Sequence, residues 1–81
     1  MNQTMKDLKI EIEKSIELMR TLRDEVRVKV HLAGMDVKDE WKKLEPKIEE
    51  VEKAAGEFTD ATRAAASDTV KRLNKLRASL S

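Results

Sequence analysis

Residues 5–33 read MKDLKIEIEKSIELMRTLRDEVRVKVHLA, and this stretch decides the fold class. Apolar residues recur in it at steps of three and four, which places them on one stripe of an α-helix. The stripe consists of Met5, Leu8, Ile12, Ile16, Met19, Leu22, Val26, Val30 and Ala33. Residues 25–32 alternate polar and apolar and could also form a strand, but a lone strand has no partner in this chain. We therefore predict an amphipathic helix over about residues 4–33, with Thr4 as its N-cap.

The clearest break signal follows this helix, at residues 32–36. Gly34 suits a left-handed C-cap for the first helix, and Asp36 is a good N-cap for a second one. The alternative is one uninterrupted helix, because the apolar stripe keeps its phase from Val26 to Trp41. We favour a turn at residues 34–36.

The second half of the chain carries an even longer apolar seam, with nearly strict three-four spacing typical of coiled-coil-like packing. Pro46 lies inside the seam, where a proline removes a helical hydrogen bond and clashes with the preceding turn. The phase is unchanged across Pro46, so we predict one long helix over residues 37–79 that is kinked near this proline. The seam residues are Val37, Trp41, Leu44, Ile48, Val51, Ala55, Phe58, Thr62, Ala65, Thr69, Leu73, Leu76 and Leu80.

The composition supports an all-α fold. Charged residues make up 41% of the 81 residues and aromatic residues 2%, so the core consists of aliphatic side chains. Two glycines and one proline are few, as expected for long helices. The length suits one domain over residues 1–81, near the size at which a single core is only marginally sufficient.

The start of the chain lacks the apolar stretch of a signal peptide, and no apolar run approaches the roughly 20 residues that cross a bilayer. The chain also has no cysteine, which excludes disulfides and thiolate metal sites. From these features we expect a cytoplasmic protein.

The residues that usually carry chemistry are isolated in this sequence. His31 is the only histidine, which leaves no His-based metal cluster and no catalytic triad. Glu49, Glu50 and Glu52 lack the glycine turn and ligand spacing of a calcium loop, so we interpret them as a solvated acidic face. The two glycines lie too far apart for a phosphate-binding loop. We therefore expect no enzyme activity, no cofactor, no metal and no small-molecule substrate.

The charge distribution is uneven although the net charge is only +1. Residues 36–60 contain nine acidic and five basic residues, whereas residues 61–81 contain five basic residues and one acidic residue. The simplest interpretation of these C-terminal cations is that they complement a helix dipole, and contact with nucleic acid or a membrane is the alternative. Trp41 and Phe58 lie on the seam, so we expect core packing rather than base stacking.

The predicted architecture is a helical hairpin, and two hairpins would form a dimeric four-helix bundle. A first helix of about 30 residues cannot cover a second of about 45, which would leave apolar side chains exposed at both helices. The protein would then be a non-catalytic interaction or assembly module that forms a homodimer or binds another helical protein. The alternatives are a peripheral module for membranes or another apolar surface, and, as the weakest, a nucleic-acid-binding module. The predicted interface residues are Val28, Leu32, Met35, Val70, Leu73, Leu76 and Leu80.

Overall fold

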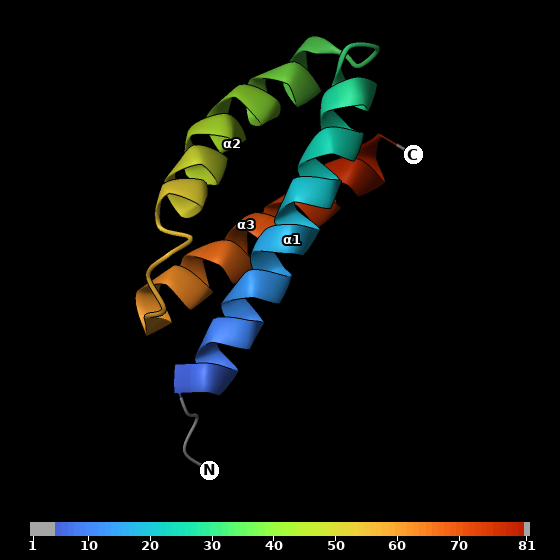
Figure 1. Cartoon of the computed structure of the whole chain (residues 1–81). Helices are drawn as coiled ribbons and strands as arrows, with labels where there is room; N and C mark the ends of the chain where they lie inside the picture. The colour runs from blue at the N-terminus through green and yellow to red at the C-terminus, as the bar shows by residue number, and fades with distance from the viewer. Residues whose placement is uncertain (1–4, 81) are drawn as a thin grey trace.

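The computed structural model describes residues 5–80, and within this range the chain forms α-helices and no strand (Figure 1). Helix α1 spans Met5–Val30, α2 spans Met35–Lys53 and α3 spans Asp60–Ser79. The all-α prediction is confirmed. The expectation of a single long helix over residues 37–79 is wrong, because the chain leaves the helical conformation between α2 and α3. The proposed cap Thr4 lies outside the described residues.

The turn between α1 and α2 occupies residues 31–34 and begins with the backbone N–H of Leu32 donating to the carbonyl of Lys29 (3.2 Å). Gly34 does not act as a left-handed C-cap. It is the N-cap residue of α2 and has an extended backbone, with φ −71° and ψ 171°. Asp36 is in the first turn of α2 rather than at its cap, where its negative charge still favours the positive end of the helix dipole.

The second break, at residues 54–59, was not predicted. Here the N–H of Glu57 donates to the carbonyl of Ala54 (2.9 Å), which forms a turn instead of a further helical repeat. Thr59 then caps α3, because its side-chain oxygen accepts a hydrogen bond from the N–H of Thr62 (3.1 Å). Pro46, in contrast, does not end a helix, since α2 continues through it.

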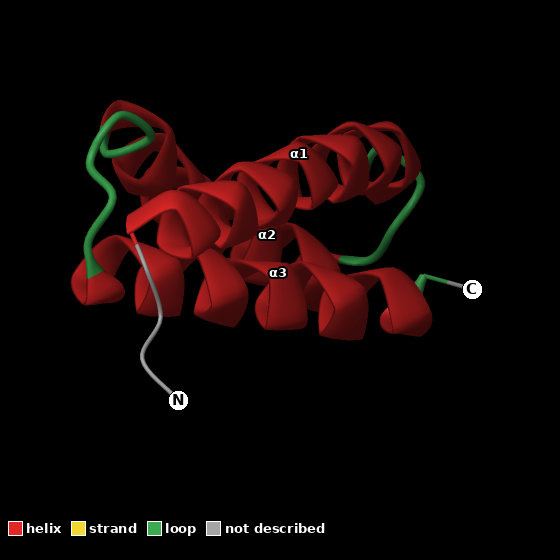
Figure 2. Ribbon diagram, turned by 60° about the horizontal axis from the view of Figure 1, so that its bottom comes forward, coloured by secondary structure: helices red, strands yellow, loops and turns green. Residues whose placement is uncertain are grey.

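The three helices run up, down and up, with α3 packed against both others (Figures 1 and 2). Helices α1 and α2 diverge from their common turn, so they touch less than either touches α3. Helices α1 and α3 run parallel, as two ion pairs show. Arg63 lies 3.6 Å from Glu11 near the start of both helices, and Arg77 lies 3.4 Å from Glu25 near their ends. The end of α3 is therefore at the same end of the molecule as the α1–α2 turn.

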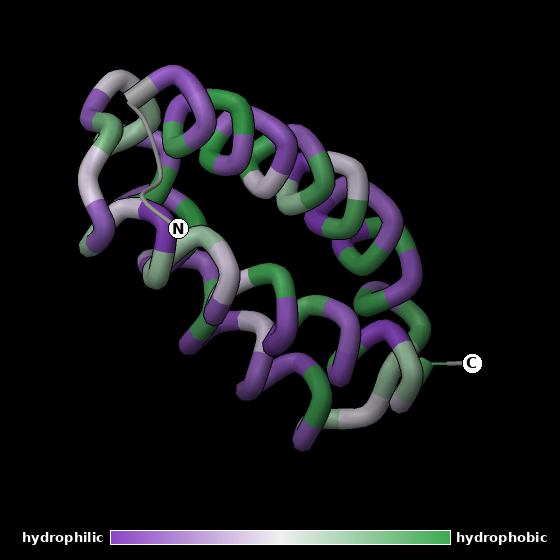
Figure 3. Tube along the Cα trace, turned by 90° about the horizontal axis from the view of Figure 1, so that it is seen from below, coloured by the Kyte–Doolittle hydropathy of each residue, from purple (hydrophilic) through white to green (hydrophobic). Residues whose placement is uncertain are grey.

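The core is built from the apolar stripes of all three helices. Along each helix, apolar residues recur about once per helical turn (Figure 3). We expected Leu22, Val26, Trp41, Leu44, Ile48 and Phe58 to be largely buried, and among these six Phe58 is the exception. It lies in the second loop and is only half-buried against the core. The others are buried as expected: Leu22, Val26, Trp41, Leu44 and Ile48.

The half of α3 that follows the second loop packs through small side chains. Thr62, Ala66 and Thr69 are buried there, and small residues at such positions let helix axes approach closely. The predicted seam used Ala65 in place of Ala66, but Ala65 is exposed, so the seam was wrong by one residue at this point. Burial of the Thr69 hydroxyl is compensated because Oγ1 donates to the carbonyl of Ala65 (2.8 Å).

Candidate interaction surface

The C-terminal part of the predicted interface is not an exposed surface in the folded chain. Leu73 and Leu76 are buried in the core of the single chain, and Val70 and Leu80 are half-buried against it. The physical reason is the reversal at residues 54–59, which folds α3 back onto α1. The length mismatch that would have left these side chains in water therefore does not arise.

The other part of the predicted interface is exposed. Leu32 is 94% exposed, Met35 71% and Val28 70%, the three highest values among the large apolar residues that remain at the surface. Val28 lies in the last turn of α1, Leu32 in the turn that follows and Met35 at the start of α2, so all three belong to the same end of the molecule. We call these three residues the apolar tip. The structure thus leaves one half of the predicted interface exposed around the α1–α2 turn and buries most of the other half.

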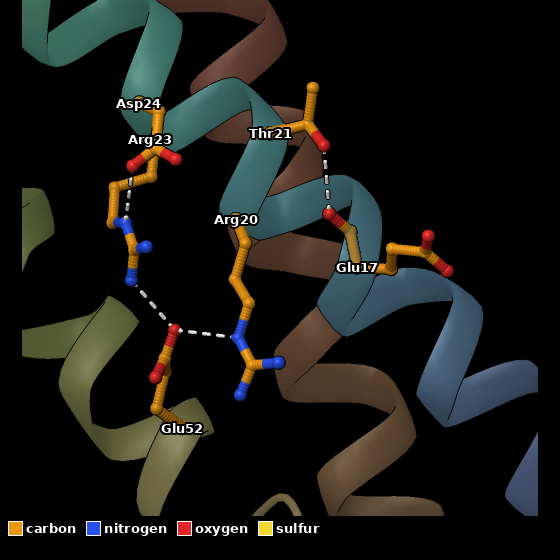
Figure 4. A network of polar contacts seen from close by, with 6 residues as sticks. All are labelled: Glu17, Arg20, Thr21, Arg23, Asp24 and Glu52. Carbon is orange, nitrogen blue, oxygen red and sulfur yellow. Dashed lines mark hydrogen bonds and ion pairs between the residues drawn. The ribbon is translucent and has the colours of Figure 1, made fainter.

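A polar cluster joins the diverging helices α1 and α2 (Figure 4). One carboxylate oxygen of Glu52 accepts a hydrogen bond from Arg23 (2.7 Å) and another from Arg20 (3.1 Å). The side chains of Glu52 and Arg23 are 29% and 25% exposed, so the closer pair is partly shielded from water. We had interpreted Glu52 as part of a solvated acidic face. That interpretation is wrong, since its partners lie on another helix and no spacing in the sequence indicates them.

The grooves between the helices are lined by both charged and apolar side chains. The groove between α2 and α3 is open and is lined by Glu40, Lys43, Arg72 and Lys75 around Leu44 and Leu76. Across residues 5–80, no cluster of His, Cys, Asp and Glu side chains could hold a metal ion. In the same range, no helix is both long enough and apolar enough to span a membrane.

Two observations bear on nucleic-acid binding. Two of the four cations near the end of α3 have carboxylate partners, because Arg72 pairs with Asp68 (3.1 Å) and Arg77 with Glu25 (3.4 Å). The aromatic rings are poorly placed for stacking on bases, since Trp41 is buried and Phe58 is half-buried. Both observations favour the helix-dipole interpretation of the C-terminal cations over the nucleic-acid one.

Comparison of the chain with known protein families, with curated proteins and with solved structures finds no match. Function is therefore inferred from the surface of this molecule alone.

Proposed function

We propose that this protein is a non-catalytic interaction module whose contact surface is the apolar tip at the α1–α2 turn. The observation that carries the proposal is the exposure of Leu32, which is 94%. A short turn between helices is normally made from polar residues and glycine. Val28, Leu32 and Met35 do not serve the core, because their side chains point into water.

Self-association is the first form that this interaction could take. A homodimer would have to bring two apolar tips, or a tip and another surface, into contact without the buried residues Leu73 and Leu76. Two like tips would also bring Arg27 and Lys38 of each copy close together, and this repulsion disfavours that arrangement. A dimeric four-helix bundle stays a prediction, and the mass in solution by light scattering tests it directly.

A photo-crosslinking amino acid at position 32 tests the proposal in the cells that make the protein. We expect crosslinked products from position 32 and none from position 50. Glu50 is exposed as well, but it lies outside the apolar tip. Products of equal amount from both positions, or none from either, would contradict an interaction surface at the turn.

A stability measurement separates an interaction role from a folding role. Changing Leu32 to Ser should alter the free energy of unfolding by no more than about 0.5 kcal/mol, as expected for a surface substitution. The same change should abolish binding to the partner that is crosslinked from position 32. If the variant unfolded much more easily, Leu32 would be part of the fold rather than a contact residue.

A further inference from the structure

The turn end of the molecule is positively charged as well as apolar. Residues 27–43 and 70–80, which lie toward this end, together with the ion-paired partners Glu25 and Asp68, contain nine basic and five acidic residues, while the remainder of the chain contains eight basic and eleven acidic ones. The molecule is 44 Å long, and charges interact over a Debye length of about 8 Å at physiological ionic strength. The electrostatic potential at the turn end is therefore positive, and charges at the far end of the molecule contribute little to it.

The apolar tip is too small to form a stable protein interface by itself. Full burial of three aliphatic side chains removes on the order of 300 Å² from water. A stable protein complex buries roughly 800 Å² on each partner. A rigid partner would also need a pocket shaped to Leu32, whereas a lipid surface deforms around a protruding side chain.

From this combination we infer that the apolar tip inserts into a membrane surface that contains anionic lipids. This inference rests on the proposed function, because it names the partner of the same surface. Val28, Leu32 and Met35 would enter the boundary between headgroups and acyl chains. Arg27 and Lys38 would remain at the level of the negatively charged headgroups.

Each of the two contributions is weak alone. Three apolar side chains give only marginal membrane affinity, as a single short lipid anchor does, and a basic cluster adds attraction that depends on anionic lipid. Both must therefore act together. The positive end also orients the molecule as it approaches, so that the turn meets the bilayer first.

Co-sedimentation with vesicles tests the inference. The probes are vesicles of pure phosphatidylcholine and vesicles in which about one third of the lipid is phosphatidylserine. We expect wild-type protein to bind only the anionic vesicles. Leu32→Gln should weaken this binding about tenfold, whereas its matched control Leu18→Gln, at an α1 leucine that is 47% exposed and far from the turn, should leave it unchanged.

A second pair of variants tests the charges. Arg27→Gln with Lys38→Gln should weaken binding to anionic vesicles about tenfold or more. The control double variant Lys14→Gln with Lys47→Gln removes the same charge outside the turn end and should have less than about a threefold effect. The circular dichroism of each variant must match that of wild type, so that a loss of binding is not a loss of fold.

An environment-sensitive dye reports which part of the molecule enters the lipid. The chain has no natural cysteine, so Met35→Cys and Lys47→Cys can each be labelled singly. We expect the dye emission to shift to the blue on anionic vesicles at position 35 only.

The inference is overturned if wild type fails to bind anionic vesicles, if Leu32→Gln binds as wild type does, or if the dye responds equally at both positions. Failure of the proposed function is distinguishable from this outcome. A crosslink from position 32 to a protein, without vesicle binding, would retain the interaction module and reject the membrane. The absence of any crosslink to protein or lipid, together with no binding to anionic vesicles, would reject both.

Discussion

Truncation of Leu73 to Ala distinguishes a three-helix monomer from an assembly that hides its C-terminal stripe between chains. Leu73 has 0% exposure and lies on α3, one turn before Arg77, whose ion pair with Glu25 places Leu73 at roughly the level of Leu22 on α1. A buried Leu to Ala change loses the transfer free energy of the removed atoms and leaves a cavity, for a total of about 3 kcal/mol. A domain of this size has a stability of about 8 kcal/mol at about 0.1 kcal/mol per residue, so the loss is large.

The assay is thermal and urea unfolding followed by circular dichroism. Because about 1 kcal/mol shifts the melting temperature of a small domain by about 5 °C, we expect Leu73→Ala to melt about 15 °C lower than wild type. The matched control is Leu32→Ala, which removes the same atoms from a side chain that is 94% exposed and should change stability by less than about 0.5 kcal/mol.

Protein concentration provides the decisive comparison. If Leu73 is buried within one chain, the loss of stability is the same over about a hundredfold range of concentration, whereas a stripe buried between chains makes the melting temperature rise with concentration. A loss below about 0.5 kcal/mol for Leu73→Ala, or a loss that depends on concentration, would refute the intramolecular core.

Three further predictions test how the helices are connected. Spin labels at Lys47 and Asp68 should be close together, because both line one groove between α2 and α3, whereas a continuous helix would hold them about 32 Å apart and so refute the loop at residues 54–59. Pro46→Ala should raise the free energy of unfolding by about 1–3 kcal/mol, since α2 continues through this position and alanine restores a backbone donor; urea unfolding with no gain would contradict that reasoning. Glu52→Gln should lower the free energy of unfolding by about 1 kcal/mol, because it weakens the ion pairs of this carboxylate with Arg20 and Arg23. Glu40→Gln, at an exposed residue whose ion pair is 3.8 Å long, should have a smaller effect. Equal losses in denaturant unfolding would show that the cluster around Glu52 does not stabilise the fold.

The sequence by itself determined that the chain is helical and which face of the first helix is buried. Leu8, Ile12, Ile16 and Met19 recur at helical spacing, and side chains at that spacing must lie on one face whatever they pack against. The exposure of Val28, Leu32 and Met35 was also predicted, because they lie opposite that face or at the turn. Helix formation and the choice of the buried face depend only on the spacing of apolar residues that are close in sequence, so the linear sequence is sufficient to predict them.

Some local signals at the second break were readable but were outweighed by the regular spacing. Gly56 followed by Thr59 and Asp60 resembles the signal at Gly34 and Asp36 that correctly indicated the first turn. The apolar period runs through both breaks without a change of phase, and a period describes a helix equally well on either side of a loop. Phase alone therefore could not distinguish one long helix from two.

Only the tertiary structure decided that α3 folds back onto α1 and α2. A continuous helix would leave Leu73 and Leu76 in water, while the reversal buries both, and this gain depends on residues of α1 that lie about 50 positions away in the chain. The same reversal created the contact of Arg77 with Glu25, and the divergence of α1 and α2 created the cluster around Glu52. Contacts of this kind join residues whose proximity is set by packing over the whole molecule, so no local spacing in the sequence encodes them.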